Sequence, residues 1–378
     1  MSSLEKLVRA LELLRTSDSA AGGATTPSSP VEASLRSSLA DLKPTSLLFR
    51  QREAALSSRE KKQCCCHLAE GVVSAAQRPS PDQLQRHLPA VVETLLQLAD
   101  DADADVRTAA DESLNRIVRG LSENNIGRLL VELYKGIKQG HSPRSVAAAL
   151  TRFAELSNRI RPQKRRAYVV NLFPCILRLT QRAELAVQES LSAALVKMAP
   201  VLGVFFTDGE TKAVLQAFLP NLEHSQAPLR RAASAAMVAL VSQCRKPETF
   251  LPWLLSTLLD WLVPLRPPES ESAGRVLGVL LCLRDITPLL EELCDGVSLE
   301  RLLQVGTDAD LRTVYTSLLL HLTQHANHNV VTSALDALCQ LLRAPPAELL
   351  AALITEGALE RSRLQPDAAP AVGKANSQ

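Results

Sequence analysis

Apolar residues recur at helical spacing along most of the chain. In residues 1–15, four leucines and a valine are three or four positions apart, so they share one helix face: Leu4, Leu7, Val8, Leu11 and Leu14. From residue 61 to residue 360 the same spacing continues, and Pro, Gly or Asp/Asn clusters interrupt it at short intervals. The pattern therefore predicts an all-α protein.

The same pattern divides the chain into four segments. Residues 1–15 predict an amphipathic helix that is too short to be stable alone in water. Residues 16–60 begin with a Ser-, Ala-, Gly- and Pro-rich run and predict a flexible linker with room for short helices. Residues 61–360 predict the folded domain, and the polar residues 361–378 predict a disordered tail.

A short motif recurs within residues 61–360. In its clearest copy, the turn acids Asp101 and Asp103 precede Val106 and Arg107, and the small residue Ala110 follows. Other copies begin near residues 61, 143, 187, 229, 274 and 330, mostly about 40 to 47 residues apart, which is typical of HEAT and armadillo repeats. The motif positions assigned in these copies include Arg144, Val187, Arg230, Ala233 and Val330.

Each residue type in the motif has a physical role. The small residue lets the two helices of a hairpin approach closely, and the turn acids cap the second helix at its positive end. We expect the Arg to reach the turn acids of the neighbouring repeat. The motif predicts a HEAT/ARM-type α-solenoid of about six to seven helical hairpins, in which each hairpin contacts only its neighbours.

The chain resembles the huntingtin family in its opening segment and through the predicted solenoid. The opening segment reads MSSLEKLVRALELLR, and the most specific later stretches are residues 131–138, 142–145, 152–156, 161–164, 323–331 and 345–350. Two features depart from the family. The chain has neither the Gln tract nor the Pro tract that can follow the opening helix, and family members are several-fold longer.

The resemblance implies a non-catalytic scaffold, the N-terminal part of a protein implicated in vesicle and organelle transport, autophagy and transcriptional adaptor binding. It implies protein partners, namely the huntingtin-associated protein of forty kilodaltons and transport or autophagy adaptors, and no direct contact with nucleic acid. It also implies a cytoplasmic location, with nuclear shuttling and peripheral membrane association.

The opening helix has two interpretations. It could dock on the first repeat, or it could act as a reversible membrane anchor and partner helix, which the flexible linker and the family resemblance favour. Ser3 and Thr16 are hydroxyl residues at the two ends of this segment and are candidate phosphorylation sites. A phosphate at Ser3 would favour the helix N-terminus, whereas one at Thr16 would oppose the C-terminal dipole.

Composition narrows the class of protein. Lys and Arg number 42 and Asp and Glu number 40, a balance that argues against a nucleic-acid binder driven by a large basic field. The eight Cys do not form a spaced disulfide framework and indicate free thiols in a reducing compartment. We find no signal-peptide pattern and expect no apolar run long enough to cross a bilayer.

Few residues suggest a catalytic or metal-binding role. His321 and His325 are four positions apart, a helical spacing that can hold zinc, and His328 follows; a helix end with a polar turn is the alternative. Residues 64–66 are three adjacent Cys, which point in different directions on a helix and cannot converge on one ion. The basic run at residues 161–166 fits a localisation signal, an acidic-partner contact or a solvated turn.

The sequence leaves two alternatives to a huntingtin-like scaffold. One is an unrelated HEAT-repeat protein, such as a transport receptor or a phosphatase-type scaffold. The other is a metal-dependent hydrolase that uses His321, His325 and His328. Nucleotide-binding, zinc-protease and serine-hydrolase motifs are absent from the sequence, so we expect no enzyme, no cofactor and no metal site.

Overall fold

The computed structural model describes residues 57–77, 81–140, 142–245, 247–262, 273–292 and 318–341. The predicted opening helix, nearly all of the linker, the tail and the candidate phosphorylation sites lie outside these residues. Within them, all regular secondary structure is helical. The chain divides into two compact units, residues 1–217 and 218–378.

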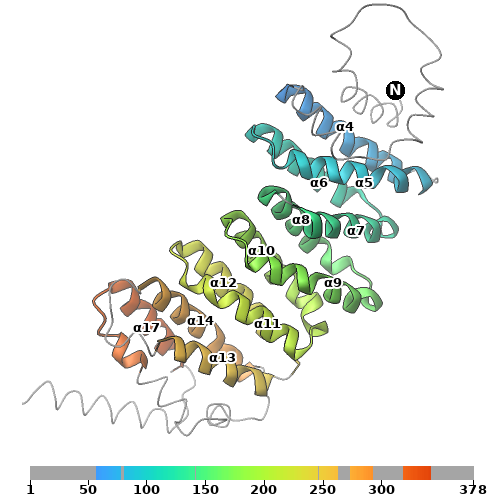
Figure 1. Ribbon diagram of the computed structural model, residues 1–378. Helices are drawn as coiled ribbons and strands as arrows, with labels where there is room; N and C mark the ends of the chain where they lie inside the picture. The colour runs from blue at the N-terminus through green and yellow to red at the C-terminus, as the bar shows by residue number, and fades with distance from the viewer. Residues whose placement is uncertain are drawn as a thin grey trace, which may run out of the picture. The chain divides into compact units, whose positions relative to one another are not determined.

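Unit 1 is a stack of helical hairpins in two layers (Figure 1). One layer is formed by α4 (Ser58–Ala76), α6 (Ala104–Gly120), α8 (Pro143–Leu156) and α10 (Leu185–Leu202), each of which packs against the next. The other layer contains α5 (Pro81–Leu98), α7 (Glu123–Gln139) and α9 (Pro162–Thr180). Short 3₁₀ turns, η1 (Ser157–Arg159) and η2 (Gly203–Phe205), follow α8 and α10, and α11 (Asp208–Phe218) comes last.

Unit 2 uses the same kind of packing. It begins with the 3₁₀ turn η3 (Leu219–Glu223), followed by α12 (Ala227–Val241), α13 (Pro247–Leu262), α14 (Ala273–Glu292) and α17 (His328–Leu341). Helix α14 packs against α12, α13, α17 and η3. The prediction of an all-α stack of hairpins is therefore confirmed in the described part of the chain, and the number of hairpins stays a prediction.

Local capping explains where several helices begin. Ser57 and Glu60 form a capping box at the start of α4: the Ser57 N–H donates to the Glu60 carboxylate (2.8 Å), and the Glu60 N–H donates to Ser57 Oγ (3.4 Å). Asp103 caps α6 through its side chain. Ser142 caps α8, where Pro143 supplies a preset φ at the first helical position.

The core is made of leucine and alanine stripes at helical spacing. In α6, the buried residues Val106, Ala110, Leu114 and Ile117 are all at most 1% exposed. Because only one stripe of each helix is apolar, a single hairpin cannot bury its core, and neighbouring hairpins must cover it.

One segment is more apolar than we expected. By length and composition, Leu185–Phe205 could cross a membrane (mean hydropathy 1.3), so the expectation that no run is long enough is wrong. Half of that segment is buried inside the protein, and α10 packs against both α8 and α9. Burial between two helices accounts for its apolar composition.

Candidate functional site

The turn before α6 is built by side chains of the repeat motif. The carboxylate of Asp101, only 7% exposed, accepts a hydrogen bond from the Asp103 N–H (2.8 Å). Arg107 turns back from α6 and donates through Nη1 to the carbonyls of Asp101 (2.9 Å) and Ala102 (2.8 Å). A charged donor thus satisfies two carbonyls that the turn leaves without helical partners.

This geometry corrects the expected role of the motif arginine. Arg107 binds the turn of its own hairpin and not the acids of a neighbouring repeat. The contact between repeats comes from α4 instead: Lys61 Nζ lies 2.7 Å from Asp101 Oδ2, and Lys62 Nζ lies 2.9 Å from Asp105 Oδ2. A preceding helix therefore supplies the cations that neutralise the acidic turn.

Other turns perform the same function with different residues. Before α12, Arg230 Nη1 donates to the carbonyls of His224 (2.8 Å) and Ser225 (2.9 Å). Before α10, Gln188 takes the place of the arginine and donates through Nε2 to the carbonyls of Leu179 (3.1 Å) and Thr180 (3.0 Å). Gln188 follows the motif residue Val187 as Arg107 follows Val106. It can take the role of the arginine because an amide and a guanidinium differ in charge but both donate N–H groups.

In two other turns, before α12 and before α17, a histidine occupies the position that Asp101 has before α6. His224 Nδ1 accepts from the Gln226 N–H (3.1 Å), and His325 Nδ1 accepts from the Asn327 N–H (2.9 Å). Each bond spans two residues, as the bond from the Asp103 N–H to Asp101 does. A ring nitrogen with a lone pair can therefore substitute for a carboxylate oxygen in this turn.

The other motif residues lie as follows. Val106, Val187 and Val330 are fully buried, and so are the small residues Ala110 and Ala233. Arg144 does not occupy the motif position assigned to it: it is exposed near the start of α8. The buried position belongs to Val146, because α8 begins at Pro143 itself, whereas Val106 is the third residue of α6.

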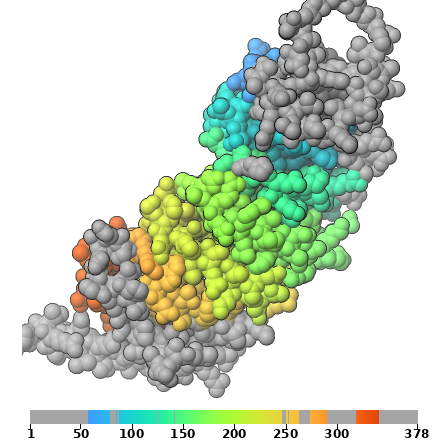
Figure 2. Space-filling view, in the orientation of Figure 1, coloured from blue at the N-terminus to red at the C-terminus, as the bar shows by residue number. Residues whose placement is uncertain are grey.

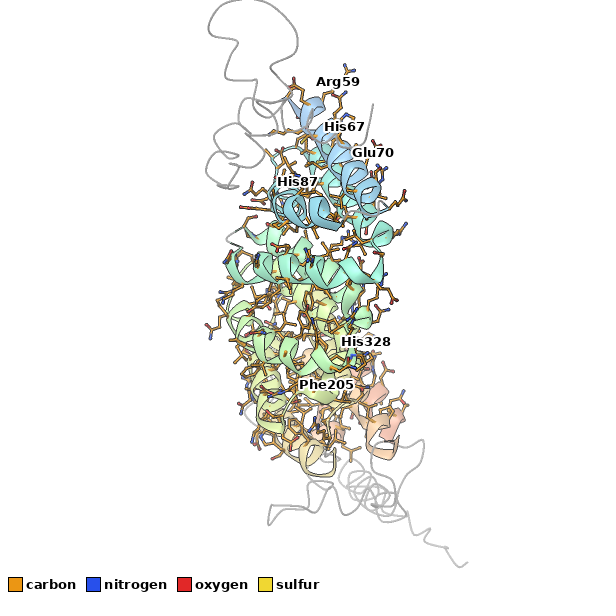
Figure 3. All side chains as sticks on the ribbon, turned by 90° about the vertical axis from the view of Figure 1, so that its right-hand side faces the viewer. Arg59, His67, Glu70, His87, Phe205 and His328 are labelled. Atoms are coloured by element: carbon orange, nitrogen blue, oxygen red, sulfur yellow. The ribbon has the colours of Figure 1, made fainter. Side chains whose placement is uncertain are left out.

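The geometry does not support the alternative metal interpretation of the histidines. The helical residues 318–322 end before His325, which lies in the turn before α17, so His321 and His325 do not share a helix face. His321 and His328 are exposed, and His328 is labelled in Figure 3. His325 is 4% exposed, and its Nδ1 is already bonded. In the described ranges, no three His, Cys, Asp or Glu side chains are placed to hold a metal ion.

Residues 95–246 match the family model described as "Huntingtin, N-terminal HEAT 1". The chain is 43% identical over 317 residues to "Huntingtin" of Takifugu rubripes, covering 82% of this chain and 10% of that protein. The chain is related to the N-terminal portion of huntingtin. It is also 28% identical over 233 residues to "HD protein homolog" of Dictyostelium discoideum, covering 53% of this chain and 7% of that protein.

The fold has a solved counterpart. A chain in the structure described as "Kap95p Binding Induces the Switch Loops of RanGDP to adopt the GTP-bound Conformation: Implications for Nuclear Import Complex Assembly Dynamics" matches with a TM-score of 0.50 and 16% identity. The match covers 89% of this chain and 41% of that chain, and it concerns the fold alone. Together with the huntingtin HEAT family model, it confirms the predicted HEAT/armadillo-type α-solenoid. The chain spans a tenth or less of the length of its curated huntingtin relatives (10% and 7%).

Charged residues link successive helices of the α4–α10 layer in this huntingtin-related chain. The residue thirteen positions after the N-cap is Glu70 in α4, Arg116 in α6, Glu155 in α8 and Lys197 in α10. Glu70 lies 3.6 Å from Arg116, and Glu155 lies 3.7 Å from Lys197; Glu70 is labelled on α4 in Figure 3. The alternation of charge favours this register of the stack, although exposed pairs contribute at most about 1 kcal/mol each.

Arg152 makes a more buried connection in the same layer. Its side chain is 6% exposed and extends from α8 to Asp111 of α6, while Nη1 donates to Glu155 (2.8 Å). A guanidinium can serve both carboxylates at once because its donors form a planar fork. Arg152 and the four residues of the charge ladder were not found from sequence, because partners about 40 residues apart become neighbours only in the stack.

Removal of the turn-closing guanidinium should destabilise unit 1. We expect Arg107→Ala to lower the free energy of unfolding by about 1–2 kcal/mol, because two turn carbonyls lose a charged donor. Urea unfolding followed by circular dichroism measures the change. Arg116→Ala on the same helix removes only an exposed ion pair and should cost less than about 1 kcal/mol. Equal losses in the two variants would contradict this role for Arg107.

The three adjacent Cys of α4 should differ in reactivity. Burial raises the pKa of both the Cys64 and the Cys65 thiol to about 12, whereas Cys66 is exposed. Thiolate is the reactive form, so we expect iodoacetamide at pH 8 to modify Cys66 at least about a hundredfold faster than either neighbour. Peptide mass spectrometry of the native chain measures these rates. Similar rates for all three thiols in folded protein would show that α4 is not packed as described.

Proposed function

We propose that this chain acts as a non-catalytic scaffold, the N-terminal part of a huntingtin-like protein, and binds partner proteins through its stacked hairpins. The relationship to huntingtin over most of the chain is the observation that carries the proposal. The stack supports it, because repeated hairpins present extended surfaces while each turn is closed by its own side chains.

The finer functions proposed here follow from the huntingtin relationship. They are vesicle and organelle transport, autophagy and transcriptional adaptor binding, with the forty-kilodalton huntingtin-associated protein and transport or autophagy adaptors as partners. We place the chain in the cytoplasm, with nuclear shuttling and peripheral membrane association. An unrelated transport receptor is the alternative, and it draws support from the fold alone.

The scaffold proposal is tested by the size of the complexes that the chain forms in cells. The chain itself has a mass of 40.9 kDa. When it carries a short tag, we expect it to elute from a sizing column in a gentle cell extract in assemblies well above that mass. Mass spectrometry then identifies the co-eluting proteins. Elution near 41 kDa without stoichiometric partners, from an extract in which the stack is folded, would overturn the proposal.

Membrane association is assigned to the apolar stripe of the opening segment. We expect the double substitution Leu7→Asp and Leu11→Asp to reduce flotation of the full chain with phosphatidylserine-containing vesicles at least tenfold, because two charges would enter the apolar face. Glu12→Gln, which lies largely off that face, is the control and should retain flotation. Flotation that survives the double substitution would remove this segment as the anchor.

A further inference from the structure

Helix α9 carries an unbalanced positive charge. Between Pro162 and Thr180 it contains Lys164, Arg165, Arg166 and Arg178 and no acidic residue. The neighbouring helices of its layer are less one-sided, since α7 carries Glu123 and Glu132 as well as basic residues. A helix without a compensating carboxylate must find its anions on other elements or outside the protein.

Only part of this charge is satisfied within unit 1. Arg166 pairs with Glu210 (2.7 Å), Arg165 donates to the carbonyl of Ile160 (3.2 Å), and Arg178 donates to the carbonyl of Ile137 (3.0 Å). The exposed side chains of Arg161 and Lys164 have neither an ion pair nor a hydrogen bond with any described residue, and the same holds for Arg128 and Lys138 of α7.

The exposed cations of α7 lie on one stripe of the helix. Arg128, Val131, Lys135 and Lys138 are separated by three, four and three residues, and all four are exposed. Lys135 is the one member with a partner in this region, Glu132 at 2.8 Å. The stripe therefore has a cation at each end and an apolar side chain between them, about 15 Å apart at 1.5 Å per residue.

Helix α9 presents a matching stripe beside it. Lys164, Ala167, Asn171, Pro174 and Arg178 follow at intervals of three and four residues and are all exposed, with cations again at the two ends. Because α7 and α9 share one layer of the stack, the two stripes form a common surface (Figure 1). The green surface of these helices is open along the right-hand side of Figure 2.

Two exposed valines lie near the middle of the two helices: Val131 within the α7 stripe, and Val170 beside the α9 stripe, three residues after Ala167 and four before Pro174. Val131 of α7 is 43% exposed and Val170 of α9 is 50% exposed. Each lies nine residues after the N-cap of its helix, so both stand at the same height in the stack. A hydrogen bond from Tyr134 Oη to the Asn171 carbonyl (3.4 Å) joins the helices at this level.

We propose that the outer stripes of α7 and α9 form a docking surface, here named the α7/α9 face, for an acidic amphipathic helix of a partner protein. Its central apolar side chains contact Val131 and Val170, and its terminal carboxylates pair with the cations at the two ends of the face. This inference rests on the proposed scaffold function and names one binding surface and the chemistry of its partner.

The charge pattern favours this layer of the stack over the opposite one. Along α4 to α10, carboxylates and cations of successive helices already pair with each other, as Glu70 does with Arg116 and Glu155 with Lys197. The α7/α9 face differs because one of its two helices, α9, has no acidic residue, whereas each of α4, α6, α8 and α10 carries at least one. A nucleic acid is a less suitable partner. Its phosphates bind broad basic surfaces, whereas the net charge of this chain is only +2. Binding of single strands also uses exposed aromatic rings on which the bases stack.

A helical peptide provides the direct test. The probe is a fluorescein-labelled, alanine-based peptide of about 18 residues, with leucines one turn apart at its centre and glutamates in its first and last turns. Fluorescence anisotropy with the full chain measures its affinity. We expect Arg128→Glu and Lys164→Glu each to weaken binding at least tenfold, and Val131→Ser with Val170→Ser about fivefold.

Controls separate the surface from general attraction. Arg231→Glu makes the same charge reversal on an exposed arginine of α12 and should leave the affinity within twofold. A peptide with lysines in place of glutamates should not bind. Equal weakening by Arg128→Glu and Arg231→Glu, equal binding of the lysine peptide, or tight binding of phosphatidylserine vesicles that displaces the peptide would overturn the inference.

This test is independent of the scaffold test. Loss of the peptide interaction with large assemblies still present on the sizing column would remove the α7/α9 face and leave the scaffold function in place. If no assemblies form but the peptide binds specifically, the scaffold function is removed and the α7/α9 face remains as a binding surface. Unchanged circular dichroism and thermal unfolding of the surface variants establish that each one is folded.

Discussion

Replacing Phe153 with Ala is expected to lower the free energy of unfolding of unit 1 by about 3–5 kcal/mol. Phe153 is completely buried in α8, and its ring meets Tyr168 of α9 edge to face, with the centroids 5.8 Å apart. The substitution removes a large apolar side chain from the centre of the stack and leaves a cavity between helices that are fixed by their own turns. It also removes the aromatic pair, which adds about 0.5–1.5 kcal/mol beyond the buried area.

The loss should also be local. Because each hairpin contacts only its neighbours, amide hydrogen exchange should accelerate most in α7, α8, α9 and α10 and least in unit 2. Val196→Ala on α10 is the control: Val196 is 38% exposed, and its loss should change the stability by less than about 0.5 kcal/mol. Urea unfolding gives the stability, and equal midpoints for the two variants would show that Phe153 is not a core residue.

Two glycines of α14 are expected to respond to alanine with opposite signs. A Cβ at Gly278 would overlap the carbonyl of Leu222 in η3, and it would lie 2.7 Å from the carbonyl carbon of that residue. The obstacle is backbone, which cannot rotate away as a side chain would. We therefore expect Gly278→Ala to cost about 3 kcal/mol, although alanine favours the helix intrinsically by about 1 kcal/mol.

Gly274 is the matched control on the same helix. The nearest atom to its Cβ would be 3.8 Å away, which is an ordinary contact. Gly274→Ala should therefore stabilise unit 2 slightly, by up to about 1 kcal/mol. Thermal unfolding of the two variants should move the midpoint in opposite directions. A rise in both midpoints would mean that α14 does not approach η3 as closely as described.

The hairpin architecture follows from the sequence because it depends on local rules. Apolar spacing identifies the buried stripes, and the sequence from Asp101 to Arg107 specifies one turn almost completely. Other turns were harder to recognise, because the physical requirement is a hydrogen-bond donor or acceptor and not a residue type. His224 does the work of an aspartate, and Gln188 does the work of an arginine.

The incorrect motif position of Arg144 and the failure of the alternative metal interpretation of His321 and His325 have a common cause. Arg144 follows a proline as Arg107 follows a valine, but α8 starts at that proline and shifts the buried position to Val146. The spacing of His321 and His325 fits a helix that in fact ends between them. In both cases the residue types were suitable and the helix boundary decided the outcome. Helix boundaries depend on how the turn closes, which the spacing of residues alone does not reveal.

Contacts between hairpins could not be derived from the chain. The ladder from Glu70 to Lys197 and the α7/α9 face both combine residues about 40 positions apart. Whether such residues contact each other depends on the register in which one hairpin stacks on the next. Only the folded stack shows which charges are neutralised by a neighbour, as at Arg116, and which are left for solvent or a partner, as at Lys164.

The turn-closing side chains have a consequence for how such a chain can change length. Arg107, Gln188 and Arg230 each bind carbonyls within their own hairpin, so these closing hydrogen bonds do not depend on which hairpin precedes or follows the turn. A whole hairpin can be duplicated or deleted in a gene with its turn intact. Selection then needs to adjust only the residues that face the new neighbour, beginning with the ladder of alternating charges.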